Sequence, residues 1–142
     1  MRELPRQLSA DELAELFEGR TRFVERLAAV EDPLGRAREL ARELSDEEKK
    51  EVLDAHPAIG AAKLSPRSAS EQGSDEAPPE LDELNRRYED RFGFRFVVFV
   101  NRRSKSAIVP ILRERLDRTR EEELETGVDE LVQIAIDRWQ RS

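Results

Sequence analysis

The strongest constraint on how this chain folds is a helix-start signal that occurs three times. In a capping box, a Ser or Thr hydroxyl and the Glu three residues later each accept a hydrogen bond from the other residue's backbone N–H. This pattern occurs at Ser9–Glu12, Ser45–Glu48 and Thr119–Glu122. Apolar residues follow each box at the spacing of one helix face, most regularly between Leu124 and Trp139. The sequence therefore predicts a predominantly helical chain.

Prolines set further helix boundaries. Proline is favoured in the first turn of a helix, where its missing N–H costs no hydrogen bond, so helices are predicted to begin at Pro33 and Pro79. The residue before a proline is disfavoured in the α conformation, so the helix that precedes Pro57 should end at His56. Pro110 lies inside another helical pattern. That helix is expected either to begin next to the proline or to be kinked there.

Two segments interrupt the helical pattern. Phe94–Val100 is β-branched and aromatic, which favours one isolated, buried extended segment. Residues 61–79 are rich in Ser, Gly and Pro and poor in apolar side chains. Structureless loops of this length within a compact domain are usually functional or disordered. We interpret this one as a loop over a site, with at most one helical turn at residues 69–72.

Composition limits the chemistry available to the chain. Its 142 residues suit one domain, and we expect residues 1–142 to form it. The absence of cysteine excludes disulfides and thiolate ligands, and the single histidine excludes metal sites that need two imidazoles. Carboxylate-only metal sites remain open. Lys and Arg total 25 against 32 Asp and Glu, and the resulting net charge of −7 disfavours nucleic-acid binding.

The sequence has no recognisable targeting signal or membrane span. Its first residues lack the apolar run of a signal peptide, and no stretch approaches the roughly 20 apolar residues that cross a bilayer. We therefore expect a cytoplasmic protein that does not bind membranes.

His56 is the first candidate for proton transfer, because no other side chain has an ordinary pKa near neutrality, about 6.5. At the end of a helix, the helix dipole should favour its imidazolium form. The alternative interpretation is a histidine that caps helix carbonyls or lies on the surface without a role. Glu71 is a candidate partner, because a carboxylate beside an imidazole fixes its tautomer and shares its proton. A solvated loop glutamate is the simpler interpretation of Glu71.

Donor groups for an anionic ligand also occur in the sequence. Arg67, Ser68 and Ser70 are suited to an anionic, amide-rich ligand, although serines are common in ordinary loops. Arginines at positions 91, 95, 102 and 103 flank the Phe-Gly-Phe segment. A nucleic-acid interface there would have to dominate an otherwise negative surface, so we expect none.

Four short motifs stand in one order along the chain. They are His56-Pro-Ala-Ile-Gly60, Ser68-Ala-Ser-Glu-Gln72, Leu84-Asn-Arg-Arg-Tyr88 and Arg91-Phe-Gly-Phe-Arg-Phe96. Together with Phe23-Val24 near the start, they resemble the 2-oxo-4-hydroxy-4-carboxy-5-ureidoimidazoline (OHCU) decarboxylases of ureide metabolism over most of the chain. Each motif alone is weak. Four in the right order, with the single histidine in the matching position, are a fairly specific signal.

The resemblance implies an all-α, single-domain helical bundle of the OHCU decarboxylase type, with the Phe-Gly-Phe segment extended beside the site, and a homodimer. It implies no metal or organic cofactor and a small-molecule ureide substrate. The implied reaction follows urate oxidation: OHCU loses CO2 and is protonated on one face, which gives (S)-allantoin. By position, His56 would be the catalytic acid/base and Glu71 its partner. Pro57 would form part of the pocket wall, and Ser68 and Gln72 would contact the substrate.

Two positions depart from the family pattern. Asn101 stands where many members have an arginine that binds substrate, and we include it, with Arg102 beside it as the candidate replacement, among the substrate-binding residues. Arg95 occupies a position often held by proline. Two alternatives therefore stay open. One is a related acid/base enzyme for a different carboxylated heterocycle, and the other is a non-catalytic helical module that binds a ureide or a protein.

Overall fold

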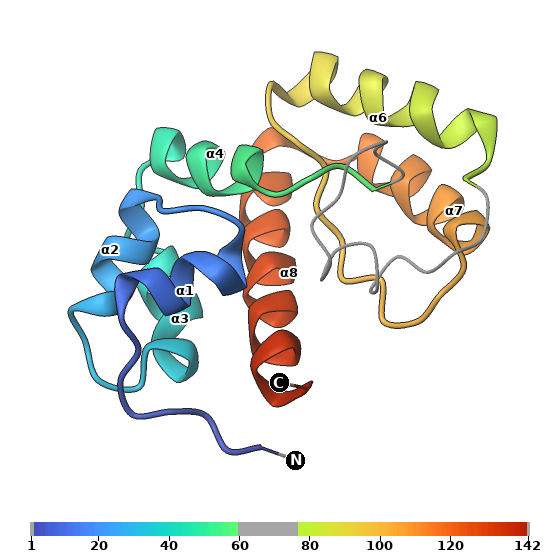
Figure 1. The fold of residues 1–142 in the computed structure, drawn as a ribbon. Helices are drawn as coiled ribbons and strands as arrows, with labels where there is room; N and C mark the ends of the chain where they lie inside the picture. The colour runs from blue at the N-terminus through green and yellow to red at the C-terminus, as the bar shows by residue number, and fades with distance from the viewer. Residues whose placement is uncertain (1, 60–76, 142) are drawn as a thin grey trace.

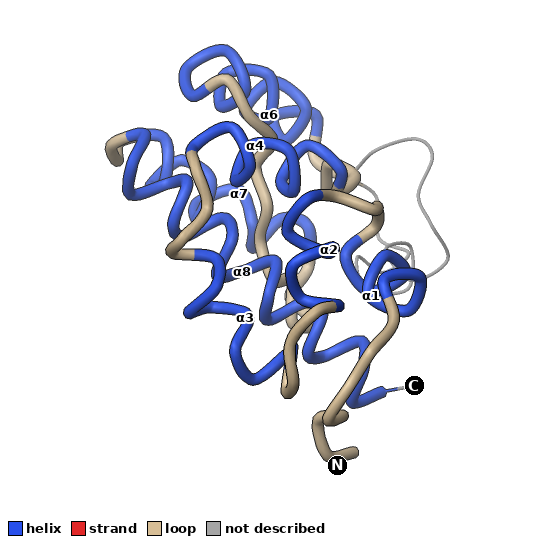
Figure 2. Tube along the Cα trace, turned by 90° about the vertical axis from the view of Figure 1, so that its left-hand side faces the viewer, coloured by secondary structure: helices blue, strands red, loops and turns tan. Residues whose placement is uncertain are grey.

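The computed structural model describes residues 2–59 and 77–141 of the chain. Within these ranges the chain is helical and has no strand (Figures 1 and 2), which confirms the predicted all-α class. None of the described helices is long and apolar enough to cross a membrane. The helices are α1 (Ala10–Phe17), α2 (Arg22–Ala28), α3 (Pro33–Ala41), α4 (Asp46–Ala55), α6 (Pro79–Phe92), α7 (Lys105–Leu116) and α8 (Arg120–Arg141).

Each predicted capping box begins a helix. At α1, the Ser9 hydroxyl accepts a hydrogen bond from the Glu12 N–H at 3.1 Å, and the Glu12 carboxylate accepts one from the Ser9 N–H at 3.0 Å. Helices α4 and α8 begin with the same pair of hydrogen bonds, at Ser45 and Thr119. The three boxes therefore satisfy backbone donors that a helix N-terminus otherwise leaves without partners.

The prolines also act as predicted. Helices α3 and α6 begin at Pro33 and Pro79, and His56 is the residue that ends α4. Helix α7 begins at Lys105 and contains Pro110, so the alternative in which it begins next to the proline is wrong. A serine side chain caps the N-terminus of α7 and stabilises the turn that precedes the proline.

Helix α8 is the axis of the fold. In Figure 1 it stands upright in the middle, with α1 to α3 on one side, α4 across its upper end, and α6 and α7 on the other side. Helices α1, α3 and α4 each pack on α8, and α6 packs on α7. The predicted apolar stripe of α8 is buried from Leu124 to Ala135, whereas Trp139 at its end is only partly buried. The C-terminal turns of α8 thus approach the surface.

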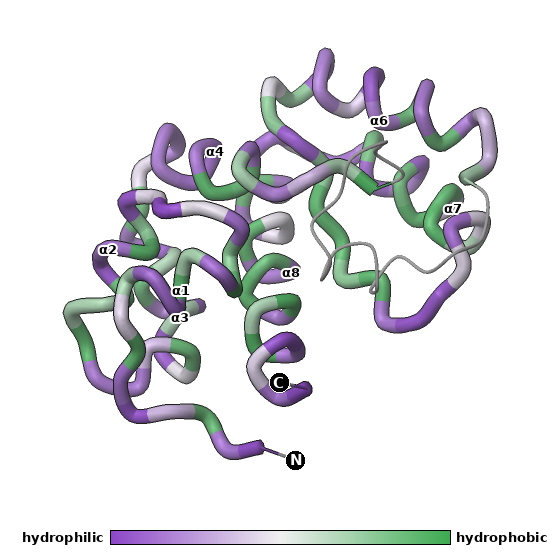
Figure 3. Tube along the Cα trace, viewed as in Figure 1, coloured by the Kyte–Doolittle hydropathy of each residue, from purple (hydrophilic) through white to green (hydrophobic). Residues whose placement is uncertain are grey.

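The segment between α6 and α7 carries a long buried stretch outside the helices. Gly93 ends α6 with a φ of 80°, a left-handed conformation that glycine adopts without strain. Residues 95–100 form neither helix nor strand, but their side chains are mostly buried. Figure 3 shows residues 96–100 as a hydrophobic stretch that becomes hydrophilic before α7 begins. The prediction that this segment is buried is confirmed. It reaches the end of α4 and the last turns of α8.

Candidate active site

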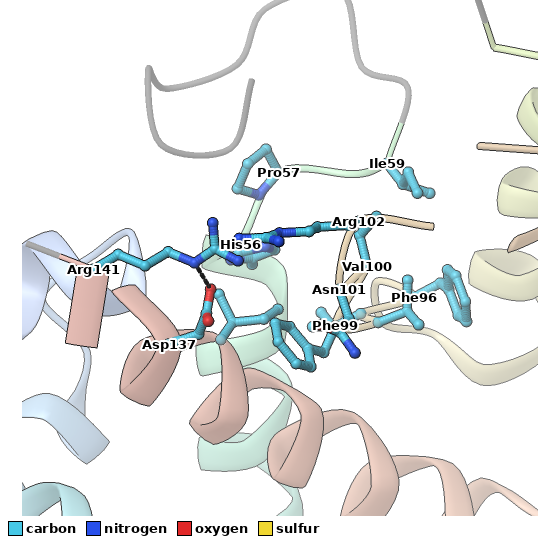
Figure 4. Close-up of a pocket in the computed structure, with 13 residues that line it drawn as sticks. His56, Pro57, Ile59, Phe96, Phe99, Val100, Asn101, Arg102, Asp137 and Arg141 are labelled. Atoms are coloured by element: carbon cyan, nitrogen blue, oxygen red, sulfur yellow. Dashed lines mark ion pairs between the residues drawn. The ribbon is translucent and has the colours of Figure 1, made fainter. Parts of the chain in front are cut away.

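A pocket lies where the end of α4, the loop after α6 and the last turns of α8 meet (Figure 4). Its floor is apolar and comes mainly from the loop and from Ile134 of α8. Its polar lining comes from all three segments: His56 at the end of α4, Asn101 and Arg102 in the loop, and Asp137 and Arg141 on α8. Apolar walls with a few convergent polar groups are typical of small-molecule sites.

The structure brings four of the predicted site residues together. His56, Pro57, Asn101 and Arg102 line this one pocket, although they come from two separate parts of the chain. The other predicted residues, Ser68, Glu71 and Gln72, and with them the predicted helical turn at residues 69–72, lie outside the described residues. No group of three or more potential metal-ligating His, Asp or Glu side chains occurs among the residues that are described.

Arg95 fixes the backbone that carries His56. Its N–H donates a hydrogen bond to the Asp54 carboxylate at 3.0 Å, and its guanidinium Nη1 donates to the His56 carbonyl at 2.8 Å and to the Asp54 carbonyl at 3.4 Å. Carbonyls at the end of a helix have no partner within the helix and need such donors. Arg95 therefore joins the loop after α6 to His56, the residue that ends α4.

The imidazole of His56 is buried and electrically neutral at pH 7. The residue is 7% exposed, and the Nδ1 atom has no hydrogen-bond partner among the described residues. Burial, with a smaller effect from the positive charges of Arg138 and Arg95, lowers the pKa of His56 to about 4, and Glu18 opposes this shift. The expected imidazolium form is therefore wrong, because desolvation and the two guanidinium groups outweigh the effect of the helix dipole. The interpretation of His56 as a surface histidine is excluded as well.

A buried ion pair beside His56 was not predicted from the sequence. Arg138 of α8 is 2% exposed, and its Nη1 lies 3.1 Å from the Glu18 carboxylate and donates to the Leu16 carbonyl at 3.1 Å. Glu18 ends α1 in a left-handed conformation with a φ of 65°. A signal was available, because Arg138 follows Ile134 and Leu131 at the spacing of the buried face of α8. A charged residue in that register is expected to have a buried partner.

Asp137 and Arg141 were also missed, and they complete the rim of the pocket. They are four residues apart on α8, and Arg141 Nε lies 2.9 Å from the Asp137 carboxylate. The sequence suggests such a pair on any exposed helix face. Only the fold shows that this pair faces His56. The site thus combines a neutral imidazole, an apolar floor and two arginines at its mouth, which suits a small anionic molecule that must exchange a proton.

Comparisons with known proteins agree with this description. A sequence model of the family described as OHCU decarboxylase matches residues 2–140. The 2-oxo-4-hydroxy-4-carboxy-5-ureidoimidazoline decarboxylase of Halalkalicoccus jeotgali is 33% identical over 102 residues, which are 66% of this chain and 58% of that protein. The uric acid degradation bifunctional protein of Bacillus sp. strain TB-90 is 32% identical over 110 residues, or 72% of this chain and 22% of that protein. The matched region therefore spans less than two thirds of either relative.

The fold is shared with solved structures as well. A crystal structure of OHCU decarboxylase in the presence of (S)-allantoin matches with a TM-score of 0.74 and 22% identity, over 89% of this chain and 94% of that one. A crystal structure of (S)-allantoin synthase matches with a TM-score of 0.64 over 91% of this chain and 47% of that one. At this identity the likeness shows the fold alone. The family model covers nearly the whole sequence, and the chain therefore belongs to the OHCU decarboxylase family.

Proposed function

We propose that this protein is a cofactor-independent OHCU decarboxylase, a carbon–carbon lyase of urate degradation that releases CO2 and forms (S)-allantoin. Membership of the family and the names of the curated relatives support the reaction. The observation that carries the proposal is the position of His56, since the chain's single histidine is buried, neutral and lines a pocket at the place where the family motif has its histidine. We further propose that residues 1–142 act as one domain, in a cytoplasmic homodimer.

The chemistry needs little from the protein beyond positioning and proton transfer. The bond between ring carbon 4 and the carboxylate breaks, its electron pair moves into the neighbouring carbon–nitrogen double bond, and CO2 leaves. The ring thus delocalises the negative charge without an electron-accepting cofactor. The remaining steps convert the 4-hydroxyl to a carbonyl and add a proton to ring carbon 5 on one face. Pocket walls that hold the ring in a single orientation would set that face.

A neutral imidazole fits the proton transfers. In our proposal, His56 accepts the proton of the 4-hydroxyl and, as imidazolium, returns it to ring carbon 5, while one proton from solvent neutralises the ring nitrogen. The lowered pKa of His56 keeps the base free at neutral pH and makes its conjugate acid a strong donor. Glu71 is proposed as the carboxylate that orients the imidazole.

The remaining contacts are proposed from position. Pro57 forms part of the pocket wall. Ser68 and Gln72 are proposed to contact the ureido and ring carbonyl groups through hydrogen bonds. Asn101 and Arg102 line the pocket from the loop after α6 and are proposed to bind the polar and negatively charged groups of the substrate.

The decisive experiment follows the formation of optically active allantoin from freshly generated OHCU by circular dichroism. We expect the protein to accelerate formation of the (S) enantiomer, and His56→Gln to lose about 10²–10⁴-fold in rate, the usual contribution of a general acid/base. The control is Glu47→Gln, an exposed position on the same helix. Far-UV circular dichroism verifies the fold of each variant. Full activity in folded His56→Gln would contradict the mechanism.

One observation favours a second candidate, a related acid/base enzyme for a different carboxylated heterocycle. The pocket has Asn101 where the family resemblance implies a substrate-binding arginine. A panel of carboxylated imidazolines and hydantoins, assayed for CO2 release, separates the two candidates. Release from another compound, without acceleration of OHCU decay, would favour the second. Binding without any release of CO2 would favour a non-catalytic module.

A further inference from the structure

The mouth of the pocket holds two arginines from different parts of the fold. Arg102 belongs to the loop after α6, and Arg141 to the last turn of α8. In Figure 4 their side chains extend toward His56 from opposite sides of the view. The side chain of Arg141 is 50% exposed, so a ligand from solvent can reach it.

Both arginines have guanidinium nitrogens without a partner among the described residues. Arg141 Nε pairs with Asp137, whose side chain is only 19% exposed, and the Nη atoms of Arg141 form no hydrogen bond with the described residues. The turn that carries Arg102 is held by its neighbour, because the N–H and Nε of Arg103 donate to the Val100 carbonyl at 3.0 and 2.9 Å. Arg102 itself has no ion pair or hydrogen bond with the described residues, and its φ of 64° is left-handed. The ion pair thus orients the guanidinium of Arg141, and the turn fixes the backbone from which the side chain of Arg102 extends.

The charges along the pocket favour an anion. Arg102 and Arg141 contribute two positive charges, Asp137 contributes one negative charge, and His56 is neutral at pH 7. The described lining is therefore net positive, although the whole chain has a net charge of −7. A planar guanidinium with two free nitrogens matches the two oxygens of a carboxylate.

We propose that Arg141, oriented by Asp137, acts together with Arg102 to bind the carboxylate of the substrate at the mouth of the pocket. The proposal rests on the proposed decarboxylase function and identifies the group of the substrate that this rim recognises. The carboxylate is present in the bound substrate and leaves during the reaction. A contact of this kind stabilises the bound substrate at least as much as the transition state, so its loss should raise KM more than it lowers kcat.

The test compares variants on the substrate and on the product, since (S)-allantoin lacks the carboxylate. Arg141→Gln is expected to raise the KM for OHCU about fivefold, a modest effect because a half-exposed charge is screened by solvent. Its inhibition constant for allantoin should stay within about twofold of the wild-type value, because uncharged contacts are retained. The control is Arg36→Gln on α3, which changes the net charge equally at an ion pair away from the pocket. It should change neither constant.

Asp137→Asn separates orientation from net charge. If Asp137 orients Arg141, this variant raises the KM for OHCU although it makes the rim more positive. A lower KM in Asp137→Asn would overturn the assigned orientation. A parallel rise of KM and the allantoin inhibition constant in Arg141→Gln would overturn the carboxylate assignment, because it would indicate a general disturbance of the pocket.

A binding experiment without turnover keeps this inference distinct from the proposed function. NMR titrations compare hydantoin-5-acetate, which carries a stable carboxylate, with uncharged hydantoin. Tighter binding of hydantoin-5-acetate that depends on Arg141 would support carboxylate binding by the two arginines even if OHCU were not turned over. In that case only the proposed function would fail. Equal affinity of the wild-type protein for the two compounds would overturn the inference. OHCU turnover with Arg141→Gln indistinguishable from Arg36→Gln would also overturn it and leave the proposed function standing.

Discussion

Helix α8 carries a buried arginine–carboxylate cluster near each of its ends, and the two differ in what surrounds them. Near the N-terminus, the fully buried Glu123 accepts hydrogen bonds from the Tyr88 hydroxyl at 2.6 Å, from Arg115 Nε at 2.7 Å and from Arg118 Nη1 at 2.9 Å. Near the C-terminus, Arg138 pairs with Glu18 beside His56. The first cluster contributes no residue to the pocket that His56 lines, whereas the second adjoins that pocket.

The comparison shows that a shifted pKa does not by itself identify an active site. Burial and the hydrogen bond to Glu123 raise the pKa of Tyr88 well above its usual range, and this cluster connects α6, α7 and α8. Its shift reflects a structural network. His56 differs because its Nδ1 is buried without a described partner and its ring faces a cavity. An available polar atom beside a space for a ligand is the feature that points to chemistry.

The largest expected effect on stability is in the first cluster. Glu123→Gln leaves the buried Arg115 without its counter-charge and should lower the free energy of unfolding by about 3–5 kcal/mol. Urea denaturation at pH 7 measures this difference. The control, Glu121→Gln, removes an exposed carboxylate two residues away and should change stability by less than about 0.5 kcal/mol. A similar small change in Glu123→Gln would contradict the structural role of this cluster.

The second expected effect is a dependence of stability on pH that originates at His56. Its pKa is about 4 in the folded state, whereas an unperturbed histidine has a pKa of 6.5, so the unfolded chain binds more protons between these values. The contribution of His56 is fully present above pH 6.5 and decreases as the pH falls toward 4, by about 3 kcal/mol in total. The free energies of unfolding of the wild type and of His56→Gln, measured at pH 7 and pH 4, isolate the contribution of His56. The same pH dependence in both proteins would show that His56 titrates normally.

Local signals made most of the fold predictable. The hydroxyl and carboxylate of each capping box lie within one helical turn, and a proline restricts only itself and its neighbour. The starts of α1, α3, α4, α6 and α8, and the end of α4, therefore follow from short stretches of sequence. The position of the α7 start was ambiguous, because proline disfavours an interior position while Ser104 and the apolar spacing favour an earlier start. Packing of Ile108, before the proline, decided it, since that side chain is fully buried.

The candidate site was predictable only in part, because it depends on contacts between distant residues. The motif around His56 was visible in the sequence, but its protonation state depends on Arg138 and Arg95, which are far from it along the chain. The dipole of α4, a local feature, predicted the opposite state. Arg141 could be recognised as an ion-pair partner of Asp137 four residues earlier, but not as a neighbour of His56. Electrostatic environments are therefore less predictable than helix boundaries.

The smallest of the three expected effects is in Arg95→Met. This variant tests whether the contacts of Arg95 with the end of α4 contribute to the lowered pKa of His56, which distinguishes the second cluster from the first. Loss of hydrogen bonds to the His56 and Asp54 carbonyls should cost about 1–2 kcal/mol of stability. Removal of a positive charge should raise the pKa of His56, so the acid limb of kcat/KM for OHCU should shift to higher pH. Arg87→Met, at an exposed position on α6, is the control and should leave the pH profile unchanged. A lower kcat/KM in Arg95→Met with an unshifted acid limb would mean that Arg95 acts only through its hydrogen bonds and packing, and that burial, Arg138 and Glu18 set the protonation state of His56 without it.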